Sequence, residues 1–103
     1  MNHFIRERLQ DAELLAQLAE ETAELGKAAL KLRRVLDGKN PTPVSMEEAF
    51  DNFEEEIADV LLCLEVLGYG DKALALFKSS MDGKRERWVG RLQEDETWAK
   101  TDT

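Results

Sequence analysis

The sequence contains one cysteine, one histidine, two prolines and no long apolar run. The single Cys63 excludes a disulfide framework and fits a reducing compartment. No apolar run reaches the length that crosses a bilayer. Residues 1–9 include several charged side chains and therefore lack the apolar core of a signal peptide. We therefore expect a cytoplasmic protein that does not span a membrane.

Positive charge is also scarce, because 14 Lys and Arg face 22 Asp and Glu, for a net charge of −8. This balance argues against binding to a nucleic acid backbone, but it leaves open a nucleotide bound through metal ions. A hydrophobic content of 43% is typical of a globular protein. A chain of 103 residues has room for one small domain. We predict a single domain over residues 1–103, with its core at about 11–92 and a polar tail at 93–103.

The segment from Phe4 to Leu36 has no proline and only one glycine, Gly26. Residues within it alternate at spacings of four and three, which is the heptad pattern of a helix packed lengthwise on others. The members of this seam are Leu14, Leu18, Glu21, Leu25, Ala28, Leu32 and Val35. The sequence leaves open whether the helix begins near Phe4 or restarts at Asp11 as its N-cap.

Turn residues separate this helix from a second one. Gly38 suits a helix C-cap, and Pro41 and Pro43 prevent helix continuation. Ser45 followed by Glu48 is typical of a capping box and predicts a helix from Met46 to about Leu67. A core-facing stripe along this second helix consists of Phe53, Ile57, Val60, Leu64 and Leu67.

A third helix is expected after Asp71, ending at Leu92 or Gln93, with its continuity through Gly83 left open. No strand pattern is present in the sequence. We therefore predict an all-α fold, an antiparallel bundle of three to four helices per chain that homo-oligomerisation completes. A chain of this size buries a limited core, and association would enlarge it.

Two acidic pairs touch these apolar stripes. Glu21 occupies a seam position that should be apolar, and Glu24 follows one turn later. Glu56 borders the second stripe, with Asp59 one turn further on. If the two helices pack antiparallel, the four carboxylates converge, and oxygen-only ligands favour Mg²⁺ or Mn²⁺. Neither pair contains histidine, which argues against a ferritin-like di-iron site and against zinc.

Basic residues lie at helical spacings that can reach such a site. Lys84 falls on the apolar face of the third helix, and Arg87 and Arg91 follow one and two turns later. Lys31 lies two turns after Glu24. Cations beside a carboxylate cluster can hold phosphate oxygens during phosphoryl transfer. The alternative is that Arg85, Arg87 and Arg91 are surface charges in i, i+4 ion pairs, which is the interpretation we prefer for Arg85.

These motifs together resemble one family. The segment Leu-Ala-Glu-Glu-Thr-Ala-Glu-Leu at 18–25 and the segment Glu-Ile-Ala-Asp-Val at 56–60 resemble the EExxE…ExxD signature of the MazG-like, all-α nucleotide pyrophosphohydrolases. The later Lys-Arg-Glu-Arg-Trp at 84–88 is similar to the basic segment of short members. The resemblance implies a homodimer or homotetramer that uses Mg²⁺ to hydrolyse a nucleoside triphosphate to the monophosphate and pyrophosphate.

The resemblance also implies roles for individual residues. The metal ligands would be Glu21, Glu24, Glu56 and Asp59. Glu20 matches the first glutamate of EExxE, and either Glu20 or Glu56 would accept a proton from the attacking water. The residues expected to bind substrate are Gln17, Lys31, Lys84, Arg87 and Arg91.

Other functions fit the same pattern. The chain can be a non-catalytic helical dimer or regulatory binding module, or a plain coiled-coil partner protein. It can also be a sibling enzyme, such as an all-α dUTPase or a phosphoribosyl-ATP pyrophosphohydrolase. Its connection through Pro41 and Pro43 is longer than in compact members of the family, and Leu62 and Cys63 stand where many members have polar residues. Base preference therefore stays open.

Overall fold

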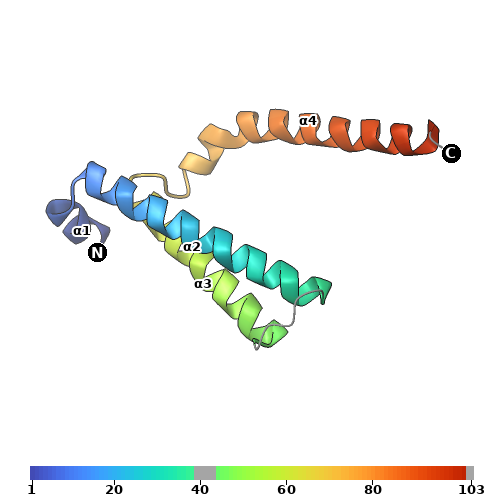
Figure 1. The fold of residues 1–103 in the computed structure, drawn as a ribbon. Coiled ribbons are helices and arrows are strands. Elements are labelled where there is room, and N and C mark those ends of the chain that lie inside the picture. Colours follow the sequence, from blue (N-terminus) through green and yellow to red (C-terminus); the bar gives the residue numbers. More distant parts are fainter. Residues whose placement is uncertain (39–43, 102–103) are drawn as a thin grey trace. The chain divides into compact units, whose positions relative to one another are not determined.

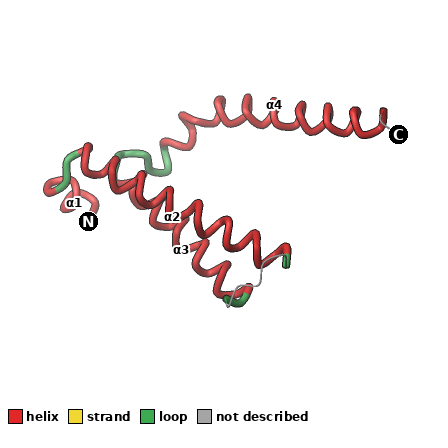
Figure 2. The backbone as a smooth tube through the Cα atoms, in the orientation of Figure 1, coloured by secondary structure: helices red, strands yellow, loops and turns green. Residues whose placement is uncertain are grey.

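The computed structural model describes the backbone of residues 1–38 and 44–101, and side chains through residue 97. Over this part of the chain every regular element is a helix and none is a strand, which confirms the all-α prediction (Figure 1 and Figure 2). The helices are α1 (Asn2–Arg8), α2 (Asp11–Asp37), α3 (Met46–Val66) and α4 (Ala73–Thr101). None of the helices in the described ranges combines the length and the apolarity that a bilayer crossing requires.

The chain divides into two compact units, Met1–Gly70 and Asp71–Thr103. The first unit contains α1, α2 and α3, and the second contains α4. In the first unit, α2 and α3 lie side by side and run in opposite directions, so they form a helical hairpin (Figure 1). That the whole chain is one domain stays a prediction.

The α2 seam faces α3 as the heptad pattern predicts. Leu14, Ala28 and Leu32 are buried, and the other four seam residues are half-buried. Leucines off the seam, such as Leu15 and Leu30, are each 55% exposed. The spacing of apolar residues along α2 therefore decides which face of this helix enters the hairpin.

The helix restarts at Asp11, as one of the two sequence interpretations expects, but its N-cap is a different residue. Leu9 has extended backbone angles and ends α1, and the extended Gln10 occupies the N-cap position of α2. Asp11 is the first residue inside α2 and not its cap. An acidic residue in the first turn interacts favourably with the helix dipole, which fits Asp11 at this position.

The caps at the loop between α2 and α3 follow the sequence prediction. Gly38 has φ of 65° at the C-cap of α2, and its N–H donates to the carbonyl oxygen of Arg34. The Ser45 hydroxyl accepts a hydrogen bond of 3.2 Å from the backbone N–H of Glu48 at the start of α3. Pro41 and Pro43 lie outside the described residues.

The end of α3 is capped by a residue from another helix. The last turn of α3 contains no basic side chain, and Arg6 of α1 donates from Nη1 to the Val66 carbonyl oxygen at 3.0 Å. The following Gly68 has φ of 109°, a conformation that side chains disfavour. Arg6 therefore attaches α1 to the carboxyl end of α3, where cations are favourable.

The buried line of α3 is shifted from the predicted stripe. Phe53, Ile57, Val60, Leu64 and Leu67 are half-buried, whereas Ala49, Cys63 and Val66 are the buried residues of this helix. Ala49 and Cys63 have small side chains, which a neighbouring helix covers more completely than a large phenylalanine. Glu56, seven residues from each of them, consequently faces the hairpin interface and not only its border.

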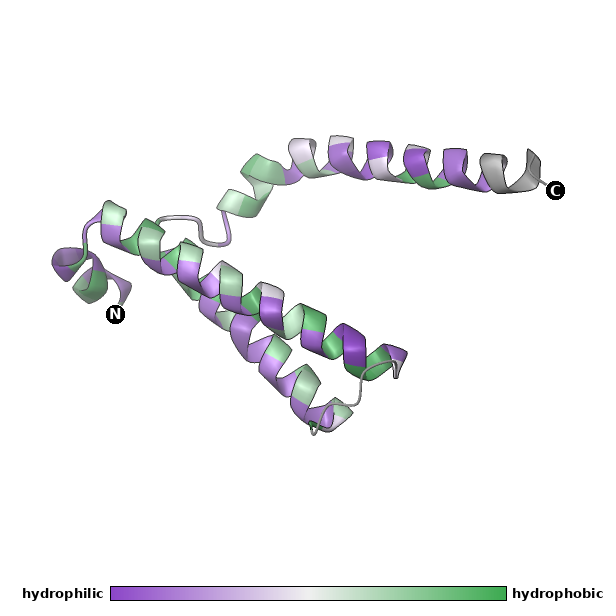
Figure 3. Cartoon of the chain, viewed as in Figure 1, coloured by the Kyte–Doolittle hydropathy of each residue, from purple (hydrophilic) through white to green (hydrophobic). Residues whose placement is uncertain are grey.

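The second unit contains one long helix. The helix α4 continues through Gly83 and extends to Thr101, whereas the sequence interpretation ends it at Leu92 or Gln93. Residues 93–97 contain neither glycine nor proline, and the Thr97 hydroxyl donates to the Gln93 carbonyl oxygen at 3.0 Å. The start of α4 is hydrophobic and much of the remainder is hydrophilic (Figure 3). The side chain of Trp98 lies outside the described residues.

Candidate functional site

Three carboxylates from α2 and α3 meet in the hairpin. Glu21, Glu56 and Asp59 each offer an oxygen, and these oxygens lie within 4.8 Å of one another. Glu21 and Glu56 are half-buried, and Asp59 is exposed. We call these three residues the acidic cluster. It joins residues that are far apart in the sequence, as the two acidic pairs predict.

Burial of the flanking residues positions both glutamates. On α2, Leu14 and Ala28 are each 3% exposed and stand seven residues before and after Glu21. On α3, Ala49 is 1% and Cys63 is 9% exposed, at the same spacing around Glu56. Residues seven apart project from nearly the same side of a helix, so packing of these apolar residues brings the glutamates together.

Glu56 is the member of the cluster with a buried carboxylate oxygen, Oε2, that lacks a hydrogen-bond partner. Desolvation raises the pKa of Glu56 above its ordinary value, and the negative charges of Asp59, Glu21, Glu24 and Glu55 raise it further. A buried carboxylate oxygen without a partner is costly, and a cation bound there would remove that cost.

Glu24 is the predicted ligand that the cluster does not include. Its Oε1 lies 3.4 Å from Nζ of Lys27, one turn further along α2. Its charge still contributes to the raised pKa of Glu56. The hairpin thus brings together three of the four predicted ligands, with the fourth nearby in an exposed ion pair.

Two further predicted residues of α2 adjoin the cluster. Gln17 donates from Nε2 to Oε1 of Glu21 at 2.9 Å. Glu20 is exposed, and it is not a member of the acidic cluster. Gln17 therefore has a protein partner, its contact with substrate stays a prediction, and Glu20 is accessible to solvent.

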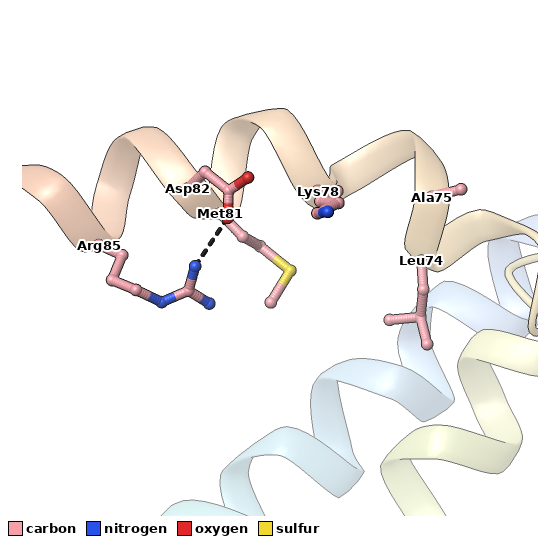
Figure 4. Close-up of a pocket in the computed structure, with 6 residues that line it drawn as sticks. All are labelled: Leu74, Ala75, Lys78, Met81, Asp82 and Arg85. Atoms are coloured by element: carbon pink, nitrogen blue, oxygen red, sulfur yellow. Dashed lines mark hydrogen bonds and ion pairs between the residues drawn. The ribbon is translucent and has the colours of Figure 1, made fainter.

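The predicted phosphate-binding residues fall in both units. Lys31 is half-buried on α2, whereas Lys84, Arg87 and Arg91 are exposed on α4 in the second unit. An open hollow along α4 is formed by other residues (Figure 4), namely Leu74, Ala75, Lys78, Met81, Asp82 and Arg85. Arg85 Nη1 lies 2.7 Å from Asp82 Oδ1, so Arg85 forms a surface ion pair as expected, at i, i+3 and not i, i+4 spacing.

Cys63 lies close enough to the acidic cluster for the charges of the cluster to change the pKa of its thiol. Burial raises the pKa of the Cys63 thiol, and the carboxylates of Glu21 and Asp59 raise it further. A thiol in such surroundings stays protonated and unreactive at neutral pH. Cys63 is therefore a buried core residue beside the acidic cluster, and its exclusion as a nucleophile stays a prediction.

The arrangement offers oxygen ligands for a hard cation and a carboxyl group with raised proton affinity. Comparison of the chain with protein-family models, with curated proteins and with solved structures finds no match.

Proposed function

We propose that the chain is a Mg²⁺-dependent nucleotide pyrophosphohydrolase that cleaves a (d)NTP to the (d)NMP and pyrophosphate. The observation that carries this proposal is the buried, unpartnered Oε2 of Glu56 in a cluster with Asp59 of the same helix and Glu21 of α2. The two sequence motifs also support the proposal, because each of the two predicted acidic pairs supplies at least one member of the acidic cluster.

The acidic cluster has the chemistry that a hard divalent cation requires. Its donors are all carboxylate oxygens, which favour Mg²⁺ or Mn²⁺. Glu24 completes the proposed ligand set once its carboxylate leaves Lys27. Mg²⁺ in such a site supplies charge stabilisation for phosphoryl oxygens and activation of water.

The side chains divide the remaining work of the proposed reaction. Either Glu56 or the exposed Glu20 accepts the proton of the water that attacks the α-phosphorus. Lys31 of α2 binds phosphate oxygens of the substrate. The sequence pattern supports a role for Lys84, Arg87 and Arg91, in the second unit, in binding pyrophosphate and balancing its charge.

Self-association is part of this proposal. Within the α2–α3 hairpin several large apolar residues are at least 40% exposed, namely Leu15, Leu30, Leu36, Met46, Phe50, Leu61 and Leu62. Burying apolar side chains of this kind stabilises association. We propose that the chain forms a homodimer or a homotetramer that covers them and completes the helical bundle.

The test is an assay of pyrophosphate release from the common NTPs and dNTPs by the purified protein in millimolar Mg²⁺. The proposal predicts release from at least one of them. Glu56→Gln should abolish turnover without loss of helix, whereas Glu54→Gln, an exposed carboxylate on the same helix, should leave it unchanged.

No release from any of these nucleotides, from dUTP or from phosphoribosyl-ATP would contradict the enzyme and favour the non-catalytic binding module. Release confined to dUTP or to phosphoribosyl-ATP would identify the corresponding sibling enzyme. The same assay therefore separates the function that we propose from its alternatives.

A further inference from the structure

We propose that Gln17 is a positioning residue for the acidic cluster, and this inference rests on the proposed function of that cluster as a cation site. Its amide Nε2 donates to Oε1 of Glu21 at 2.9 Å. The bond joins two residues one helical turn apart on α2. Gln17 therefore acts on a cation through Glu21 and not by direct contact.

The cluster needs a device that fixes Glu21. A glutamate side chain has several rotatable bonds, and the nearby negative charges of Glu56 and Asp59 repel its carboxylate. Without a bound cation this repulsion favours rotamers of Glu21 that turn away from α3. The hydrogen bond from Gln17 opposes that movement and holds the carboxylate where the other two can share a ligand with it.

An amide is well suited to this task. A carboxylate has two oxygens with about four acceptor sites, so Glu21 keeps its second oxygen and further lone pairs for a cation after Oε1 has accepted from Gln17. The amide is uncharged, so it does not compete with the cation as a lysine would. In contrast, the ammonium of Lys27 lies against Glu24, which is outside the cluster.

The length of the side chain matters as much as its polarity. On a helix, residues four apart are neighbours, and glutamine spans the distance between them. Asparagine is one methylene shorter, so its amide falls short of Glu21. Methionine has nearly the size and the helix propensity of glutamine but has no N–H to donate. These two substitutions separate the hydrogen bond from polarity and from helix formation.

The experiment is a calorimetric titration of the full-length protein with Mn²⁺. We expect Gln17→Met and Gln17→Asn each to raise the dissociation constant for Mn²⁺ by about 10-fold or more, as for other residues that orient metal ligands. Melting in EDTA should be nearly unchanged, because Gln17 is exposed. The control is Arg33→Met, which removes the exposed 3.6 Å ion pair of Arg33 with Asp37, at the same spacing on the same helix.

The outcomes separate this inference from the proposed function. Equal Mn²⁺ affinity of Gln17→Met and the wild type would overturn the role of Gln17 and leave the pyrophosphohydrolase standing. Weaker Mn²⁺ binding by both variants in a protein that releases no pyrophosphate would support Gln17 and overturn the enzyme. A wild-type protein that binds no Mn²⁺ would overturn both.

Discussion

Glu21 of α2 and Glu56 of α3 meet at the middle of the hairpin, and each stands midway between two buried residues of its own helix. Each thus takes a position at which the surrounding pattern calls for an apolar side chain. Charged groups at such positions weaken packing unless a ligand compensates them. The proposed metal site explains why both helices keep a carboxylate there.

The first prediction concerns how much Glu21 lowers the free energy of unfolding of the metal-free protein. In EDTA, Glu21→Leu should raise the free energy of unfolding by about 1 kcal/mol, because leucine buries apolar surface in the seam and removes repulsion from Glu56. The same substitution should abolish stabilisation by Mg²⁺. Urea unfolding with and without Mg²⁺ measures both effects. A less stable Glu21→Leu protein in EDTA would show that Glu21 has favourable partners in the metal-free chain.

The second prediction concerns pH. The pKa of Glu56 is raised in the folded protein above the ordinary value of 4.5, so the folded state binds more protons than the unfolded state between these two values. The contribution of Glu56 to stability is therefore fully present below pH 4.5 and is lost as the pH rises through its folded pKa.

Glu56→Gln should remove this loss of stability at higher pH, because glutamine does not ionise. In EDTA it should be more stable than the wild type at neutral pH, and the difference should shrink as the pH falls toward 4.5. Urea unfolding across this pH range measures the difference, with Glu54→Gln as the control. A difference that does not vary with pH would contradict the raised pKa.

The third prediction contrasts two glycines. Gly68 has φ of 109°, a backbone conformation that is strained for alanine, so Gly68→Ala should destabilise the protein by about 1–3 kcal/mol. Gly26 lies inside α2 with open space around it, so Gly26→Ala should stabilise the folded protein by about 0.5–1 kcal/mol. Thermal unfolding compares them, and similar melting temperatures for the two variants would contradict the turn geometry at the end of α3.

The part of the fold that the sequence predicts best is α2. Its heptad seam has strong periodicity over many residues, so local pattern and packing agree. The α3 register is harder to predict, because a stripe of large residues from Phe53 to Leu67 suggests one face while the small residues Ala49 and Cys63 are more buried. Side-chain size, and not hydrophobicity alone, decides which residues of α3 are most buried.

The end of α4 was predicted too early for a related reason. Gly83 and the polar residues after Leu92 weaken the apolar pattern, yet none of them forbids helix, and the backbone continues through them. The periodicity of apolar residues predicts which face of a helix packs. It does not predict where the helix ends when no proline or cap follows.

The candidate site was predictable in its acidic members and not in the residues that hold them. Glu21, Glu56 and Asp59 stand out because they interrupt or border apolar stripes. The bond from Gln17 and the ion pair of Lys27 depend on rotamers, which spacing alone does not fix. The roles of Lys84, Arg87 and Arg91 stay a prediction.

Thermal unfolding of the protein in EDTA and in millimolar Mg²⁺ is the most direct test of a divalent cation site between α2 and α3. A cation that binds the native state alone raises the melting temperature, and we expect an increase of about 5 °C in the wild type. Glu54→Gln should respond in the same way, and Glu56→Gln should respond little. Identical melting temperatures of the wild type in EDTA, Mg²⁺ and Mn²⁺ would contradict a divalent cation site between α2 and α3.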